Sequence, residues 1–254
     1  MLRAVTIFDF HVRLAPGPDT VPALLATMDA HGISRAAVSA GGVIDLDRLS
    51  AQLVEGGHVE ALADNRFVRA AAELSGNRLV PFYFASPYTD LAAYRGQAHR
   101  YRGLELSPAV YGVGFADPRT VALVRVAADV GHPVYTVCLG QPGARTADLV
   151  ALARQFPTVP FVYGHCGFTG IDTNGINQIA GQPNIVTETS GCLTVTARIA
   201  LQRLGADRVL FGTEYPLQDP GVELDKYAAL GLDEPTRQKV FWHNAKRLLG
   251  EEHR

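Results

Sequence analysis

The sequence predicts an α/β fold, a single (β/α)₈ TIM barrel, and two features of the chain carry this prediction. Short β-branched or aromatic runs alternate with longer Ala- and Leu-rich segments along the whole chain, which is typical of repeated βα units around a parallel sheet. The length of 254 residues is that of one barrel, which commonly has about 250 residues. An open doubly wound sheet is the alternative, but no Gly-x-Gly-x-x-Gly follows the first strand.

Eight segments have the composition of strands, because each is short and rich in β-branched or aromatic residues. In chain order they span residues 5–13, 35–40, 78–85, 103–107, 133–138, 159–165, 185–188 and 208–213.

Helical segments lie between these strands, since their apolar residues recur at intervals of three and four. Several end in a glycine that suits a left-handed cap, as Gly32, Gly131 and Gly205 do. The expected helices include residues 21–31, 58–75, 118–130, 146–155, 194–204 and 235–249.

No linker-like, low-complexity or repeated segment divides the chain, so we expect one domain over residues 1–254. The long second connection, residues 43–77, is a candidate lid over the barrel mouth, with residues 43–57 as its most mobile piece.

Composition restricts the partners. The formal net charge is -2 and Lys and Arg do not cluster, which argues against nucleic acid and anionic membranes. No apolar run approaches a bilayer span, and no signal-like stretch precedes the first strand, so the expected location is cytoplasmic. Three widely spaced cysteines offer neither a disulfide framework nor a Cys-x-x-Cys motif. We expect a small-molecule substrate, anionic or neutral, and a possible homo-oligomer.

The first strand carries the most informative polar residues. Strand alternation predicts Asp9, His11 and Arg13 on one face, opposite Phe8, Phe10 and Val12. Two imidazoles at positions 11 and 13 would chelate a divalent ion, but a guanidinium has no lone pair to offer. The alternative interpretation is an ion pair between Asp9 and Arg13 that closes the barrel end.

Further polar residues end the other strands. In TIM barrels the active site lies at the carboxyl ends of the strands, so these side chains are expected to meet. Beyond the first strand they are Glu105, His165, Glu188 and Glu214, whereas the expected inward residue of strand five is Val137.

Motifs along essentially the whole chain resemble the amidohydrolase-related branch of the amidohydrolase superfamily, which includes non-oxidative decarboxylases and the pyrone dicarboxylate lactonase. The matching elements are Phe8-Asp9-Phe10-His11, Gly103-Leu104-Glu105-Leu106-Ser107-Pro108, Gly131-His132-Pro133-Val134, Gly164-His165-Cys166-Gly167, Thr189-Ser190-Gly191, Leu210-Phe211-Gly212-Thr213-Glu214-Tyr215-Pro216 and Asn244-Ala245-Lys246-Arg247-Leu248-Leu249.

Departures from the family pattern are as informative as the matches. The resemblance implies Asp-x-His-x-His on strand one, His at the ends of strands five and six, and Asp on strand eight. This chain keeps His11 and His165 but has Arg13, Val137 and Glu214 at the other positions. We therefore expect no catalytic metal, partly because Arg13 would repel a cation. The alternative is one divalent ion such as zinc on His11, His165 and Glu214.

The resulting hypothesis assigns catalysis to His165, Glu214 and His11. His165 is the candidate general acid or base, because imidazole titrates near neutral pH and the position resembles the family's catalytic histidine. Glu214 either orients water or takes a proton, or it only pairs with Arg13, and His11 hydrogen-bonds substrate or Glu214.

Arg13 is the candidate clamp for a substrate carboxylate or an oxyanion. Glu105 and Glu188 are either substrate-binding residues or members of core ion pairs. Tyr215, with Tyr83 and Tyr111, is either an oxyanion donor or a packing residue.

Three functions remain open on the sequence. The first is hydrolysis of a lactone or amide-type bond in a small, carboxylate-bearing molecule. The second is a lyase, decarboxylase or cyclase reaction in the same barrel, and the third is a non-catalytic binding or scaffold protein.

Overall fold

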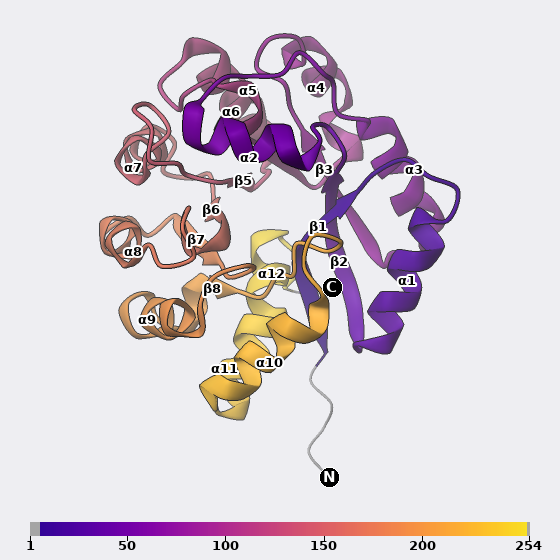
Figure 1. The fold of residues 1–254 in the computed structure, drawn as a ribbon, viewed down its shortest axis with the longest axis vertical. Helices are drawn as coiled ribbons and strands as arrows, with labels where there is room; N and C mark the ends of the chain where they lie inside the picture. Colours follow the sequence, from indigo (N-terminus) through magenta and orange to yellow (C-terminus); the bar gives the residue numbers. More distant parts are fainter. Residues whose placement is uncertain (1–5, 253–254) are drawn as a thin grey trace.

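Eight parallel strands surround a central axis and twelve α-helices pack around them in the computed structural model, which describes residues 6–252 (Figure 1). Each strand pairs in parallel with the next along the chain. The strands are β1 (Ile7–Leu14), β2 (Ile33–Ala40), β3 (Leu79–Phe84), β4 (Gly103–Leu106), β5 (Val134–Thr136), β6 (Phe161–Tyr163), β7 (Ile185–Glu188) and β8 (Val209–Leu210). The predicted TIM barrel is therefore confirmed.

The segment after β8 returns to β1 and closes the barrel. Val12 forms a parallel bridge with Tyr215, and the Glu214 amide donates to the His11 carbonyl at 2.7 Å. These contacts bring the candidate residues of the first and last strands together.

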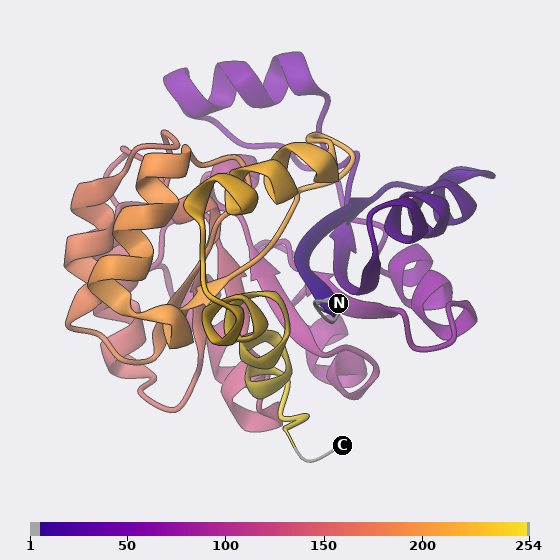
Figure 2. The same ribbon diagram turned by 90° about the horizontal axis from the view of Figure 1, so that it is seen from below.

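The helices follow the strands in alternation and form the outer layer (Figures 1 and 2). Six of them begin at an aspartate whose carboxylate accepts a backbone N–H, a strong helix-start signal. The helices are α1 (Thr20–Ala30), α2 (Leu46–Glu55), α3 (Asn65–Leu74), α4 (Leu91–Gln97), α5 (Pro108–Tyr111), α6 (Pro118–Val130), α7 (Thr146–Gln155), α8 (Thr173–Ala180), α9 (Thr194–Leu204), α10 (Pro220–Leu230), α11 (Glu234–Gln238) and α12 (Asn244–Leu248).

Two hydrophobic layers hold the barrel. Inside it, Phe8, Phe10, Phe82 and Tyr135 pack in one buried cluster, and outside it apolar strand residues meet the helices. Among residues 6–252, no helix is long and apolar enough to cross a membrane.

The strict alternation predicted for the first strand is wrong. The pairing of β1 with β2 shifts register between Asp9 and Val12. Phe10 packs in the interior cluster, and the next residue, His11, also turns inward and stacks on Tyr135. A bulge of this kind breaks the two-residue period and re-aims a side chain, as bulges beside active sites do.

The second connection also differs from the prediction. Helix formation at residues 58–75 is confined to α3, which begins after its Asp64 cap, and the segment expected to be mobile contains α2, capped by Asp45. The predicted helix 235–249 exists as α11, a π-helical turn and α12. The expected strand start at Val5 lies outside the described residues.

Candidate active site

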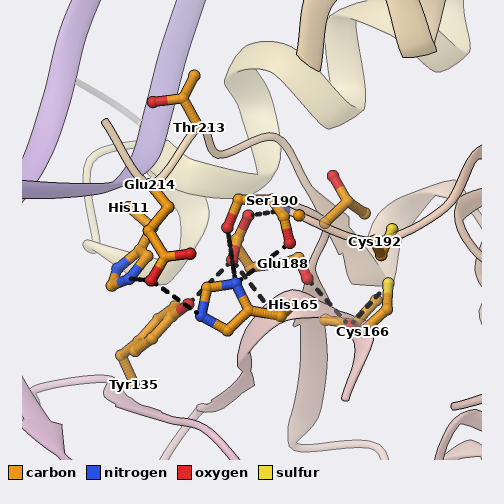
Figure 3. Close-up of polar contacts among 12 residues, drawn as sticks. His11, Tyr135, His165, Cys166, Glu188, Ser190, Cys192, Thr213 and Glu214 are labelled. Carbon is orange, nitrogen blue, oxygen red and sulfur yellow. Dashed lines mark hydrogen bonds and ion pairs between the residues drawn. The ribbon is translucent and has the colours of Figure 1, made fainter. Parts of the chain in front are cut away.

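Three predicted catalytic side chains converge at the carboxyl end of the barrel (Figure 3). The Nε2 atom of His165 lies 3.4 Å from Glu214 Oε1, and that of His11 lies 3.9 Å from the same oxygen. One ligand atom from each residue falls within 4.8 Å of the others. We call His11, His165 and Glu214 the donor cluster, because each offers a possible metal-ligand atom within this distance of the others.

Unusual backbone conformations aim two members of the donor cluster. His165 lies beyond the end of β6, in a 3₁₀ turn, with a φ of 59°, and Glu214 follows β8 with the same φ of 59°. Left-handed φ values are uncommon for residues other than glycine and concentrate at functional sites. The sequence predicted His165 at the end of a strand, whereas it lies in the 3₁₀ turn that follows β6.

Ser190 fixes the orientation of the His165 ring. The Ser190 hydroxyl donates to Glu188 Oε2 at 2.9 Å, so its oxygen and the Ser190 carbonyl accept from His165 Nδ1, at 2.9 and 3.1 Å. This pattern makes Nδ1 the donor, so the neutral form of the ring has its lone pair on Nε2, facing Glu214. A partner on the far nitrogen is how proteins prepare a histidine for base or ligand chemistry.

Glu188 anchors this network and is completely buried. It accepts from Tyr135 Oη at 2.9 Å, from the His165 amide at 3.3 Å and from the Ser190 amide. Glu188 therefore orients the residues around it, and its predicted contact with substrate does not fit its complete burial.

Tyr135 links Glu188 to His11. Its ring stacks on the His11 imidazole with centroids 4.1 Å apart and planes 11° apart. Burial, reinforced by nearby carboxylates, raises the pKa of Tyr135 far above its ordinary value, so the phenol is a neutral donor. Two glycines leave space for Tyr135 and Glu188. A Cβ at Gly164 would collide with the Tyr135 hydroxyl, and one at Gly212 would collide with the Glu188 carboxylate.

Arg13 pairs with Glu105, and neither Asp9 nor Glu214 is its partner within the described chain. The Arg13 Nη1 to Glu105 Oε1 distance is 2.5 Å, with 2% of the Glu105 side chain exposed and 16% of that of Arg13. Of the two alternatives predicted for Glu105, substrate binding or a core ion pair, its contact with Arg13 agrees with the ion pair. The guanidinium still lines the mouth and has donors not used by this pair.

Asp9 braces the barrel closure. Its carboxylate accepts from the Thr213 amide at 2.9 Å and from the Thr213 hydroxyl at 2.5 Å. Burial raises the pKa of Asp9 to about 7 despite these hydrogen bonds.

Electrostatics keep Glu214 ionised and favour the neutral form of His11 in the donor cluster. Burial, and then the charge of Arg13, lower the pKa of His11, so this ring is neutral near pH 7. Burial alone would raise the pKa of Glu214, but His165, His11 and Arg13 outweigh it and lower the value to about 2. The side chain of Glu214 is therefore ionised, and the one nearby guanidinium is already paired with Glu105.

The donor cluster fits a divalent ion. The buried His11 Nε2 has no hydrogen-bond partner among the described residues, as a ligand atom awaiting an ion would. Ligands about 2.1 Å from a tetrahedral ion lie about 3.4 Å apart, and His165 Nε2 and Glu214 Oε1 are 3.4 Å apart here. The predicted repulsion by Arg13 is offset by Glu105, so this geometry gives no support to the expectation of a metal-independent site.

A cavity of about 490 Å³ opens beside Glu214 and Arg13. Tyr215 lines it, with its hydroxyl 3.5 Å from Thr27 Oγ1 rather than near His165. Tyr83 packs outside the barrel against Tyr94 and Tyr101. Its predicted role as an oxyanion donor does not fit that place.

Sequence reasoning missed Tyr135 and Ser190 as site residues. Tyr135 lies two residues before Val137, which packs against the interior cluster, so inward parity on β5 already pointed to it. Ser190 lies in the family-like Thr189-Ser190-Gly191 run, but nothing local indicates its contact with His165.

Comparison with known proteins agrees with this architecture. The amidohydrolase family model matches residues 8–250. An uncharacterized TIM-barrel protein from Bordetella bronchiseptica has a TM-score of 0.77 at 19% identity, covering 98% of this chain and 100% of its own. A protein assigned as a 2-pyrone-4,6-dicarboxylic acid hydrolase from Pseudomonas putida has a TM-score of 0.72 at 19% identity, covering 99% and 100%.

A third similar structure is a 5-carboxyvanillate decarboxylase from Novosphingobium aromaticivorans with bound manganese, in its D314N mutant form. Its TM-score is 0.73 at 16% identity, with 98% of each chain covered. No curated protein matches the chain.

Proposed function

The chain belongs to the amidohydrolase family, and on this premise we propose that it is a hydrolase that cleaves a lactone or amide-type bond of a small molecule at the barrel mouth. The observation that carries the proposal is the convergence of His11 Nε2, His165 Nε2 and Glu214 Oε1 beside a cavity. Three possible electron-pair donors this close together, one of them an ionised carboxylate, form a favourable site for a cation.

Glu214 is the member of the donor cluster that meets substrate, since it lines the cavity and has 21% of its side chain exposed. In a hydrolysis it accepts a proton from the attacking water and returns it to the leaving oxygen or nitrogen. His11 and His165 lie behind it, held by Tyr135 and Ser190, so their Nε2 atoms keep a fixed direction.

His11, His165 and Glu214 would together hold one divalent ion. When bound, such an ion supplies Lewis acidity, which polarises a carbonyl group and lowers the pKa of a water molecule. The hydrogen bonds of His165 Nδ1 to Ser190 turn its Nε2 toward the site, and the lowered pKa of His11 favours the neutral form that a metal ligand requires.

The same geometry also suits the role predicted for His165 from the sequence, that of a general acid or base, with Glu214 3.4 Å away. One lone pair on His165 Nε2 cannot serve both roles, so an ion on that atom excludes acid-base catalysis by it. We favour the ion because His11 Nε2 has no other described partner.

Isotope incorporation tests the reaction class. The protein is supplied with one equivalent of Mn²⁺ and incubated with a panel of lactones and acyl amides in H₂¹⁸O. Incorporation of ¹⁸O into a carboxylate product, lost in His165→Gln, supports hydrolysis. Turnover that survives in both His165→Gln and Glu214→Gln would contradict it.

A decarboxylase or other lyase is the second candidate, favoured by the fold shared with the manganese-containing decarboxylase. A lyase reaction in labelled water would place solvent deuterium on a product carbon and no ¹⁸O in a carboxylate. If neither isotope enters a product while a ligand still binds, the remaining function is that of a non-catalytic binding protein.

A further inference from the structure

The cavity beside Glu214 is polar at one end and apolar over most of its wall. Arg13 and Glu214 stand at the inner end, where the donor cluster begins. Val43, Ile44, Leu46, Leu49 and Val110 supply apolar lining, and the Phe84 ring lies against the Arg13 guanidinium, 5.4 Å from it. A volume of about 490 Å³ is within the range of about 300–1,000 Å³ typical of small-molecule sites.

Helix α2 and the residues before it form much of this apolar wall. Gln52, 7% exposed, fixes the helix, because its side-chain amide donates to the carbonyls of Ala109 and Val110 at 3.0 and 3.2 Å. Leu49 faces the cavity, whereas Val54 on the same helix is 82% exposed and is not part of the lining. The wall is therefore held in place over the mouth, where Figure 2 shows α2 outside the ring of helices.

Charge at the cavity limits what the outer part can accept. Arg13 is the one cation in the lining, and Glu105 already neutralises it at 2.5 Å. The other charged lining residues, Asp19 and Glu214, are acidic. A second negative group on a ligand would meet carboxylates or hydrocarbon and lose its hydration without a partner.

We infer that the substrate is an acyl or lactone compound with an uncharged hydrocarbon body, which occupies the wall formed by α2, and that dicarboxylates are excluded. The inference rests on the proposed function in one respect, since it takes the polar group at the Glu214 end to be the reacting one. Leu49 is then a specificity-determining residue, because it sets how long a hydrocarbon body fits.

Product analogues test this without turnover. Calorimetric titration of the full chain, with one equivalent of Mn²⁺, uses butanoate, hexanoate, octanoate and octanedioate. Affinity is expected to rise about fourfold per added methylene, the equivalent of about 0.8 kcal/mol. Octanedioate, equal in length to octanoate, is expected to bind at least tenfold more weakly. Equal affinity across the series, or tighter binding of octanedioate, would overturn the inference.

Matched variants of α2 locate the binding. Leu49→Phe is expected to weaken octanoate at least tenfold while leaving butanoate unchanged, and Val54→Phe is expected to change neither. Leu46→Trp provides a second test at the rim if Leu49→Phe melts early. Equal weakening of both acids by either lining variant would contradict a chain-length site. These acids are not hydrolysed, so their binding tests the hydrocarbon site and the isotope experiment tests the reaction. Either result can fail while the other holds.

Discussion

Two neighbouring groups of residues at the barrel mouth differ in how their charges are compensated. Arg13 and Glu105 neutralise each other at 2.5 Å, whereas the donor cluster of His11, His165 and Glu214 has no described cation of its own. Both groups begin on β1, two residues apart. On the proposed function, the Arg13–Glu105 pair shapes the mouth and the donor cluster is the reactive part, and the variants below test this division.

Removal of the Glu214 carboxylate should have the largest effect. Glu214→Gln keeps the size of the side chain but cannot accept a proton, so turnover is expected to fall about 10³-fold. Steady-state kinetics on any substrate found by the isotope assay measure this. Glu73→Gln, on the exposed face of α3, serves as the control and should leave the rate unchanged.

Breaking the Arg13–Glu105 pair should mainly cost stability. Arg13→Met leaves the buried Glu105 carboxylate unpaired, which is expected to lower the free energy of unfolding by about 3 kcal/mol. Glu105→Gln in that background should restore most of the loss. Urea denaturation of the single and double variants measures the coupling, and purely additive losses would show that the pair is not a unit.

Loss of the Tyr135 hydroxyl should weaken the support of the donor cluster. Tyr135→Phe keeps the stacking on His11 but removes the donor to Glu188, at an expected cost of about 1.5–3 kcal/mol. Tyr88→Phe, whose hydroxyl donates to a backbone carbonyl at the surface, is the matched control. Equal melting temperatures for the two variants would rule out the anchoring role.

Asp9 should produce a smaller, pH-dependent effect. Its pKa is about 7 in the folded protein and near 3.8 when unfolded, so its protonated form favours folding. This contribution is complete below pH 4 and is lost as the pH rises through 7, by at most about 1.4 kcal/mol per pH unit.

Asp9→Asn removes this titration, so its unfolding free energy should fall less than that of the natural protein between pH 4 and 7. Chemical denaturation at several pH values makes the comparison. Parallel curves for the two proteins would mean that Asp9 is already ionised in the fold.

The barrel could be predicted from sequence periodicity alone, because the alternation of strands and helices follows from the local composition along the chain. Helices at 118–130, 146–155 and 194–204 have the predicted bounds, since Pro, Thr and Gly mark their ends. Helix α2 was missed although Asp45 caps it and leucines recur along it at helical spacing, and only its fixation by Gln52 on α5 was beyond local reasoning.

The donor cluster could be named from the sequence because chemically distinctive residues end successive strands. Its geometry could not, since the bulge in β1 and the left-handed turns at His165 and Glu214 depend on tertiary closure. The partner of Arg13 was also beyond local reasoning, because Glu105 is distant in sequence.

The central claim, that the donor cluster holds a positive ion, is tested most directly by calorimetric titration of the metal-stripped protein with Mn²⁺ and Zn²⁺. We expect one equivalent per chain in the natural protein, with binding lost in His11→Ala and Glu214→Gln and kept in Arg13→Met/Glu105→Gln. Natural protein and His11→Ala that bind these ions equally, or not at all, would contradict it.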